Sequence, residues 1–564
     1  MTYRAPVQEI TFLLEHVLDG ARLGETELFN DAGLDTAAAI FDEAAKLAEG
    51  VIAPLNRASD EQGARLENGV VRCTPGFSEA YQTLAEGGWI GMNGPESYGG
   101  MGMPITVTVA VNEMMSSACL SLALNPLMTQ GQIEAFEHHA SEDLKAMFLE
   151  KLVTGKWTGT MNLTEPQAGS DVGALSTKAE DNGDGTYAIS GQKIFISWGD
   201  HDIAENIVHL VLARLPGGAA GTKGISLFAV PKFIPDAAGE PGVANNLRAV
   251  SLEHKMGLHG SPTAVMSFDG AVGWMVGEEN GGMAAMFTMM NNARLGVGIQ
   301  GLSQAEGAYQ HALAFARERK QGRTPLEGET AIIGHADVRR NLMTMKALTS
   351  VARAICLDTA ISLDLARANS DASLDARAAF LTPIAKAFGT DTGCNVAELG
   401  VQVHGGMGYI EETGAAQFYR DVRVTAIYEG TNGIQAMDLV GRKLKDDGAA
   451  AFALLAEIGL TAAIAEESHP DLAAFLHGAE SSLAITTHWM VSAPLNSRFA
   501  GATQYLRAFA LALGGHYLLK AALKDSTRLP LARFHIRQLM QVVDPLCSAA
   551  REGDAPLYAD PLTQ

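Results

Sequence analysis

Three short segments of this 564-residue sequence are rich in hydroxyl, glycine, aromatic and acidic residues. Glycine lets backbone amides approach a phosphate closely, and a carboxylate such as Glu429 can act as a base where water is excluded. Taken singly, the hydroxyls of Thr164 and Ser170 indicate turn caps, and Glu429 indicates a solvated carboxylate. The segments are residues 161–171 (MNLTEPQAGSD), 191–198 (GQKIFISW) and 402–409 (QVHGGMGY), the last followed by IYEGTN at 427–432.

Other common catalytic and cofactor signatures are absent from the sequence. No G-x-G-x-x-G motif joins a predicted strand to a helix, so a nicotinamide-binding βαβ unit is not expected. There is no phosphate loop, no H-E-x-x-H and no G-x-S-x-G. His138 and His139 are adjacent on a predicted helix and face different directions, so we expect no metal site there.

In their order and spacing, the three segments resemble the acyl-CoA dehydrogenase family over about residues 35–445. The resemblance implies FAD-dependent α,β-dehydrogenation of an acyl-CoA thioester. It also implies a flavin held between a β domain and a C-terminal helical bundle. The implied electron acceptor is an electron-transferring flavoprotein.

The resemblance also assigns residues to the flavin. In the family, the loop matching residues 161–170 lies along the flavin ring, and the segment beginning at Phe195 lies beside it. This chain has Phe-Ile-Ser where family members often have Trp-Ile-Thr, so an aromatic and a hydroxyl group are kept. The implied flavin-binding residues are Met161, Leu163, Thr164, Ser170, Phe195, Ile196, Ser197, Arg319, Gln402, Gly405, Gly406 and Thr431.

Arg319 belongs to a basic segment that resembles one reaching the flavin pyrophosphate of a partner subunit in the family. A guanidinium group suits phosphate because its planar fork donates two hydrogen bonds. Family members often continue with an aromatic–glycine pair, whereas Gln321 and Gly322 follow here. A solvated helix end is the alternative interpretation of these basic residues.

Glu429 matches the commonest position of the family's catalytic base. In the family, this base takes the α proton while the β hydrogen leaves as hydride to flavin N5. Desolvation raises the pKa of such a carboxylate and makes it a stronger base. The implied substrate-binding residues are Ser170, Asn291, Arg294 and Gly430, although the family commonly has Asp at the position of Asn291.

The extensions at the two ends of the chain indicate which branch of the family it resembles. A helical extension at residues 3–18 and about 115 residues beyond Leu444 resemble a long bacterial branch. That branch includes an enzyme acting on 3-methylmercaptopropionyl-CoA in dimethylsulfoniopropionate breakdown, and its other members act on ordinary short- or long-chain acyl-CoAs. In the family, a C-terminal extension can occupy the surface where two dimers would meet, so we expect a homodimer.

Hydrophobic periodicity indicates the elements that must position these segments. A helical N-terminal region, a β-rich middle and a helical remainder predict an α+β fold rather than a doubly wound sheet. The expected helices are 35–55, 105–127, 130–153, 283–319, 333–368 and 374–403, with β runs at 186–190, 207–212 and 225–230. The expected domains are an N-terminal helical domain (1–155), a β-barrel-like domain (156–280), a helical bundle (281–446) and a helical extension (447–564).

The composition argues for a reduced, acidic protein. The net charge of −23 disfavours nonspecific binding to nucleic acid or anionic membranes. The five cysteines are scattered and form no Cys-x-x-Cys pair, which favours a cytoplasmic location without disulfides or a metal cluster. Residues 1–6 contain no apolar signal core, and no uninterrupted apolar stretch of membrane-spanning length is found.

Three alternatives stay open at this point. An acyl-CoA oxidase would share most of these motifs and pass its electrons to oxygen. A nucleic-acid-binding relative would need a basic face, for which the nearest candidates are Lys520, Lys524, Arg528, Arg533 and Arg537. A flavin-bound scaffold without turnover is disfavoured by the presence of Glu429.

Overall fold

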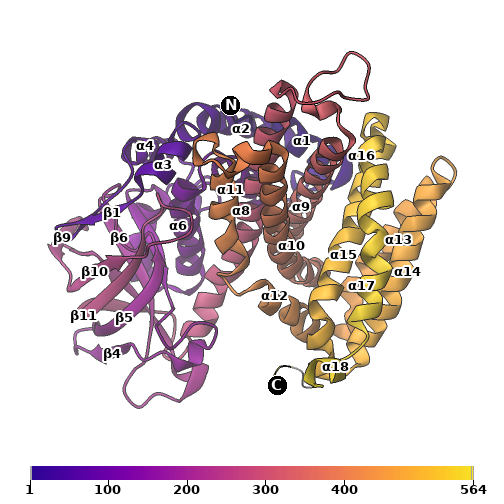
Figure 1. Cartoon of the computed structure of the whole chain (residues 1–564). Coiled ribbons are helices and arrows are strands. Elements are labelled where there is room, and N and C mark those ends of the chain that lie inside the picture. The colour runs from indigo at the N-terminus through magenta and orange to yellow at the C-terminus, as the bar shows by residue number, and fades with distance from the viewer. Residues whose placement is uncertain (1–2, 560–561, 563–564) are drawn as a thin grey trace. The chain divides into compact units, whose positions relative to one another are not determined.

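The computed structural model describes residues 3–559 and 562 of the chain (Figure 1). Its contacts divide the chain into two compact units. The first unit comprises Met1–Lys46, Pro104–Ser117 and Arg294–Gln564, and the second comprises Leu47–Met103 and Ala118–Ala293. The expected order of helical, β and helical regions is confirmed.

A mixed sheet forms the centre of the second unit. Within the described residues its strand order is β3-β6-β7-β11-β5-β4, with β10 paired to β11. β3 and β6 are parallel, and the other pairs are antiparallel. The strands are β3 (Trp157–Asn162), β4 (Lys178–Asp181), β5 (Tyr187–Ser197), β6 (Asn206–Ala213), β7 (Ser226–Pro231), β10 (Leu247–Leu252) and β11 (Thr263–Val276).

Each face of this sheet has its own hydrophobic core. Leu210 and Leu227 belong to the core that includes residues of α6 (Leu120–His139) and α7 (Glu142–Val153). Their neighbours Val211 and Phe228 belong to the core of the opposite face. Successive side chains of a strand point to opposite faces, so these fully buried strands read as continuous apolar runs.

The second unit contains further short elements. They are η3 (Ala48–Ile52), α3 (Leu55–Gln62), β1 (Arg65–Glu67), β2 (Val70–Arg72), α4 (Phe77–Glu86), β8 (Phe233–Pro235) and β9 (Pro241–Ala244). The expected helices 105–127 and 130–153 are divided differently, because Cys119 is extended with φ −157° and separates α5 (Ile105–Ala118) from α6. Ser141 then starts α7 by accepting a hydrogen bond from the Leu144 backbone N–H at 3.4 Å.

The first unit is helical. Figure 1 shows α9 and α10 side by side and α13, α14, α15 and α17 packed together near the C-terminus. Its elements include α1 (Val7–Phe12), α2 (Leu34–Leu47), α9 (Ala336–Asn369), α10 (Ala372–His404), α11 (Ala415–Val422), α12 (Asn432–Asp438), α13 (Ala449–Ala465), α14 (Pro470–Ser492), α15 (Leu495–Lys524), α16 (Leu529–Phe534), α17 (Val543–Ala550) and α18 (Ala555–Tyr558). Helix α8 (Gly282–Glu318) contains the division between the two units.

Helices α8 and α10 approach closely in the first unit at glycine positions. A Cβ atom added to Gly301 would lie 2.4 Å from the Gly389 carbonyl oxygen, and one added to Gly389 would lie 2.6 Å from that of Gly298. Only glycine allows two helix backbones to come this near. The crossing fixes the position of Lys386 on α10 relative to α8.

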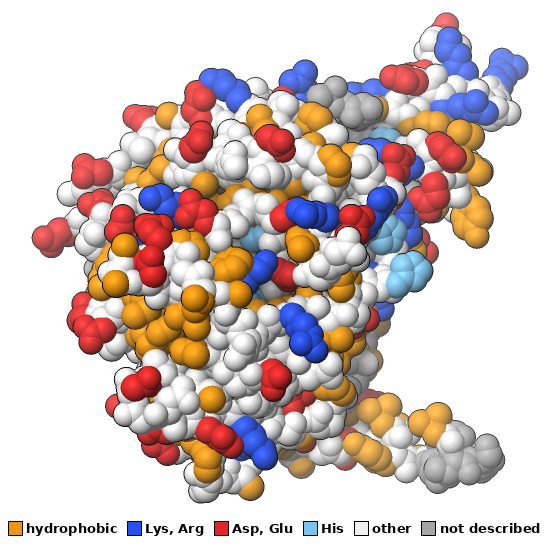
Figure 2. All heavy atoms as spheres, turned by 90° about the vertical axis from the view of Figure 1, so that its left-hand side faces the viewer, with side chains coloured by type: hydrophobic (Ala, Val, Ile, Leu, Met, Phe, Trp, Pro, Cys, Tyr) orange, Lys and Arg blue, Asp and Glu red, His pale blue; other side chains and the backbone are white. Residues whose placement is uncertain are grey.

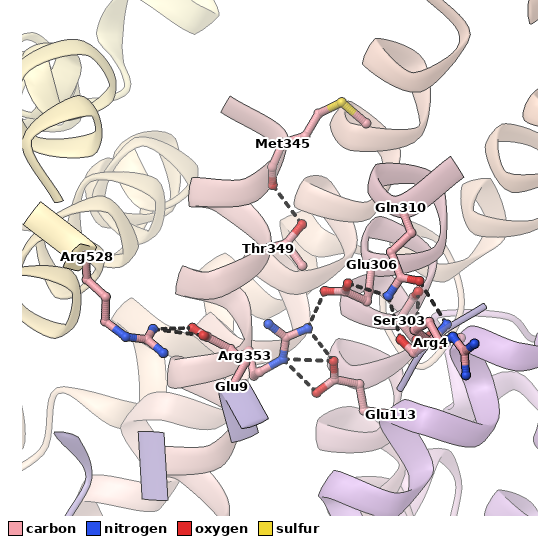
Figure 3. Close-up of polar contacts among 11 residues, drawn as sticks. Arg4, Glu9, Glu113, Ser303, Glu306, Gln310, Met345, Thr349, Arg353 and Arg528 are labelled. Atoms are coloured by element: carbon pink, nitrogen blue, oxygen red, sulfur yellow. Dashed lines mark hydrogen bonds and ion pairs between the residues drawn. The ribbon is translucent and has the colours of Figure 1, made fainter. Parts of the chain in front are cut away.

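A buried ionic cluster joins α5, α8 and α9 (Figure 3). Arg353 is 2% exposed, and its Nη2 donates to Glu113 Oε1 at 2.7 Å and to Glu306 Oε2 at 2.6 Å. Gln310 Nε2 donates to Glu306 and to the carbonyl oxygen of Arg4. The cluster therefore also holds the N-terminal segment, at Arg4, against α8.

One segment, Asp446–Ala465, is long and apolar enough to cross a membrane by length and composition alone. It contains α13, which packs against α14 and α15. Glu457 interrupts its apolar run and forms an ion pair with Arg377 on α10. Among the described residues this is the one such helix, and its acidic residues keep it from being an uninterrupted apolar stretch.

Candidate active site

Glu429 lies in a left-handed turn immediately before α12. Its φ is 54°, and Gly430 follows with φ 82°. A non-glycine residue in this region costs about 1–3 kcal/mol, so surrounding contacts must hold it. The Thr431 hydroxyl oxygen begins α12 by accepting a hydrogen bond from the Ile434 backbone N–H at 3.3 Å. The turn thus places the carboxyl group just outside the first turn of a helix.

The environment of Glu429 makes its carboxyl group a weak acid. The residue is half-buried, and burial raises the pKa of Glu429 to about 7. Two cations, Arg294 and Lys386, act in the opposite direction and favour the carboxylate. A carboxyl group with a pKa near 7 can accept a proton at neutral pH and is a stronger base than an exposed glutamate.

Both cations near Glu429 are buried and anchored. Arg294 is 6% exposed, and its Nη1 donates to Asp438 Oδ2 at 3.2 Å. Lys386 is fully buried, and its Nζ donates to Asn432 Oδ1 at 2.9 Å. Burial lowers the pKa of Lys386 to about 8 and also lowers that of Arg294. Asp438 and Asn432 both belong to α12, so this helix orders the charges around the turn.

Two of the predicted flavin-binding segments meet in the second unit. The Ile194 backbone N–H donates to the Thr164 carbonyl oxygen at 2.9 Å, and Lys193 Nζ donates to that of Leu163 at 3.0 Å. Lys193 Nζ also lies 2.9 Å from Glu165, and both of these side chains are buried. Burial opposes ionisation of Glu165, but Lys193 and neighbouring hydrogen-bond donors hold its pKa well below the usual value. The buried ion pair thereby fixes the loop that carries Thr164.

The end of β5 presents an aromatic ring to solvent. Phe195 is 60% exposed and has φ 60°, whereas Ile196 is 2% exposed and packs into the sheet core. Ser197 is half-buried. An exposed aromatic side chain beside hydroxyl groups suits a planar, partly apolar cofactor, so these residues fit a flavin. Because the Ile196 side chain is buried in that core and its carbonyl oxygen accepts from the Gly199 backbone N–H at 3.1 Å, its flavin contact stays a prediction.

The predicted flavin-binding residues of the first unit are exposed to solvent. Gly405 and Gly406 directly follow α10, are exposed, and have open space where a Cβ atom would lie. Gln402 in the last turn of α10 is also exposed. Arg319, exposed just after α8, donates to Gln321 Oε1 at 3.3 Å. Thr431 is exposed, but its hydroxyl oxygen is already used as the cap of α12. The flavin roles of these residues stay predictions.

The predicted substrate-binding residues are found in different surroundings. Ser170 is exposed in its loop, and Gly430 is half-buried in the turn of the base. Arg294 pairs with Asp438 and its charge favours the carboxylate of Glu429, whereas its contact with CoA stays a prediction. The side chain of Asn291 lies outside the described residues. Among the described residues, no group of three or more His, Cys, Asp or Glu could hold a metal ion.

Sequence reasoning missed three features of the site: Lys386, Gln435, and the pair of Lys193 with Glu165. Lys386 carried a signal, because it interrupts the apolar run PIAKAF inside a predicted helix. A lysine is almost never fully buried without a partner, so a buried interaction could have been inferred. Gln435 and Lys193 carried no comparable signal, since a glutamine or lysine outside a long apolar run is ordinarily exposed.

Comparison with known proteins agrees with these features. Models of the acyl-CoA dehydrogenase N-terminal, middle and C-terminal domains match residues 35–156, 160–271 and 280–444. The chain is 50% identical over 455 residues to 3-methylmercaptopropionyl-CoA dehydrogenase of Ruegeria pomeroyi, covering 79% of this chain and 77% of that protein. It is 37% identical over 461 residues to a butyryl-CoA dehydrogenase of Syntrophomonas wolfei, covering 78% and 75%.

A solved structure shows the same fold over nearly the whole chain. Caenorhabditis elegans ACDH-11 superposes with a TM-score of 0.80 at 20% identity, covering 96% of this chain and 92% of that one. The family is FAD-dependent, and the residues at the end of β5 fit a flavin. The chain therefore belongs to the acyl-CoA dehydrogenase family: it is an FAD-dependent oxidoreductase that acts on an acyl-CoA.

Proposed function

We propose that the substrate is 3-methylmercaptopropionyl-CoA and that the product is 3-methylthioacryloyl-CoA, within dimethylsulfoniopropionate breakdown. The observation that carries this proposal is the 50% identity, over most of both chains, to the Ruegeria pomeroyi enzyme of that name. The short-chain alternative is favoured by the butyryl-CoA dehydrogenase relative, at 37% identity.

In the proposed reaction, Glu429 takes the α proton of the acyl thioester. Bound FAD would supply the hydride-accepting chemistry by which the β hydrogen leaves as the double bond forms between the α and β carbons. The backbone N–H of Glu429 supplies a hydrogen bond to the thioester oxygen, where negative charge develops. Arg294 and Lys386 keep the pKa of Glu429 from rising further, which leaves the carboxylate available at neutral pH.

Anaerobic bleaching of the flavin absorbance tests the substrate. The panel contains 3-methylmercaptopropionyl-CoA, butyryl-CoA, octanoyl-CoA and palmitoyl-CoA, each mixed with the holoenzyme without an acceptor. We expect the thioether substrate to bleach fastest and palmitoyl-CoA slowest. A preference for a long chain would overturn the substrate and leave the family in place, and bleaching by no compound would point to another acyl group.

The titration of Glu429 predicts the pH dependence of turnover. Only its carboxylate form can accept a proton, so kcat should fall as the pH drops below about 7. Lys386→Met removes a cation that favours the carboxylate, so the fall should begin about one pH unit higher. Profiles of kcat against pH, measured with a dye acceptor, check this. Lys346→Met, which changes an exposed lysine on α9, is the matched control, and a profile that moves in neither variant would contradict the assignment.

We also propose that electron-transferring flavoprotein is the acceptor, as the resemblance implies. Oxygen consumption during turnover without an acceptor would instead identify an oxidase. A homodimer and a cytoplasmic location stay predictions, and the molar mass in solution decides between dimer and tetramer. The segment 447–564, on which the homodimer depends, begins beyond the family match that ends at residue 444.

Ion pairs partly neutralise the basic face that the nucleic-acid-binding alternative would need. Arg528 pairs with Glu9 and Asp525, and Arg533 pairs with Asp471. Ion pairing reduces the positive charge that phosphate binding needs. Independently of these arginines, the one face of the molecule that Figure 2 shows has acidic and basic side chains interspersed.

A further inference from the structure

The turn that carries Glu429 contains two successive left-handed residues, with φ 54° at Glu429 and 82° at Gly430. Gly430 adopts this conformation freely, whereas Glu429 does not. The direction of the Glu429 carboxyl and backbone N–H groups depends on this local backbone. A residue that holds the turn therefore controls both groups that the proposed reaction uses.

Gln435 on α12 holds the turn from within the protein. Its side chain is fully buried, and its Nε2 donates to the Glu429 carbonyl oxygen at 3.1 Å and to the Gly430 carbonyl oxygen at 3.4 Å. A backbone carbonyl group that is shielded from water needs a hydrogen-bond donor within the protein. The Gln435 amide group provides that donor for both carbonyl groups. The two carbonyl groups at the heart of the turn thus share one donor.

The orientation of the Gln435 amide is determined by these contacts. If the amide were flipped, Oε1 would face two carbonyl oxygens, which cannot donate a hydrogen bond. In the observed orientation Oε1 is buried and finds no hydrogen-bond partner among the described residues. Leaving an acceptor unsatisfied is unfavourable, so the two bonds made by Nε2 dominate the choice of orientation.

Gln435 also packs tightly against the turn. A Cβ atom added to Gly430 would lie 2.8 Å from Gln435 Nε2, closer than real Cβ contacts. The absence of a side chain at Gly430 is what lets the amide reach both carbonyl groups. Neighbouring Asn432 is held independently by Lys386 and Thr390, so the start of α12 provides a fixed base for Gln435.

We propose that Gln435 is a positioning residue for the reaction: its amide group holds the Glu429–Gly430 turn so that the carboxylate and backbone N–H of Glu429 face the substrate. This inference rests on the proposed role of Glu429 as the base. It predicts that losing the amide group misplaces the base without removing it. Small displacements of a catalytic group lower the rate of the chemical step more than they lower binding.

The test uses Gln435→Met in the full-length holoenzyme, because methionine keeps the length of the side chain and lacks the donor. We expect kcat to fall about 10- to 100-fold, while the dissociation constant of the enoyl-CoA product, measured from the flavin spectrum, changes less than about 3-fold. Bound FAD per chain should stay unchanged. Gln310→Met is the matched control, because it also removes amide bonds, to Arg4 and Glu306, but far along α8.

Each outcome decides the proposal. If Gln435→Met keeps kcat within about 2-fold, or if its loss follows the loss of FAD or equals that of Gln310→Met, the residue is only structural and the proposal fails. Gln435→Leu replaces the variant if Met does not yield folded protein, and failure of both to fold also overturns it. If Glu429→Gln stays active, the proposed base itself is wrong, which separates that failure from this one.

Discussion

Glu429→Gln is expected to bind FAD and the acyl-CoA normally and to lose turnover by roughly 10²- to 10⁴-fold, the usual contribution of a general base. The amide has the shape of the carboxyl group but cannot accept the α proton. The loss should appear in the chemical step, so anaerobic flavin reduction in a stopped-flow instrument is the direct measurement. Substrate binding, read from the flavin spectrum, should change little.

The matched control for this prediction is Glu466→Gln, which changes an exposed carboxylate at the end of α13. It should reduce the flavin at the wild-type rate. Full activity in Glu429→Gln, with FAD bound, would show that another group removes the proton. Loss of FAD from the variant would instead mean that the substitution damages the fold rather than the chemistry.

Arg353→Met is expected to lower the free energy of unfolding by about 3–5 kcal/mol, because it removes one partner of a buried ionic cluster. Arg353 forms ion pairs with both Glu113 and Glu306, as Figure 3 shows. Without it, two carboxylates are left close together where water cannot solvate them. Burial already raises the pKa of Glu113 in the presence of the guanidinium group.

Urea-induced unfolding followed by circular dichroism measures this effect. Arg340→Met on the same helix is the control, since its ion pair with Asp337 is exposed and is worth about 0–1 kcal/mol. A double variant, Glu113→Gln with Arg353→Met, should recover part of the loss because it removes one unpaired carboxylate. Equal unfolding midpoints for Arg353→Met and the wild type would mean that the cluster contributes little to stability.

The sequence by itself determined the family and the order of the helical and β regions. The long helices are examples: the expected ranges 283–319 and 374–403 correspond to α8 (Gly282–Glu318) and α10 (Ala372–His404). Such elements are predictable because hydrophobic periodicity is local: the spacing of apolar residues within a helix or strand shows which of its faces is buried. The segments that carry the resemblance are likewise short and continuous, and Glu429 was found through them.

Only the tertiary structure decided what surrounds Glu429. Lys386 precedes it by 43 positions and Arg294 by 135, so no local pattern relates them. Their charges act on Glu429 because α8 and α10 meet at glycines and because α12 anchors both side chains. The chain also returns from the second unit to the first for residues 104–117, which brings Glu113 to Arg353. Burial and long-range charge depend on packing between distant segments, and a pattern of neighbouring residues does not record them.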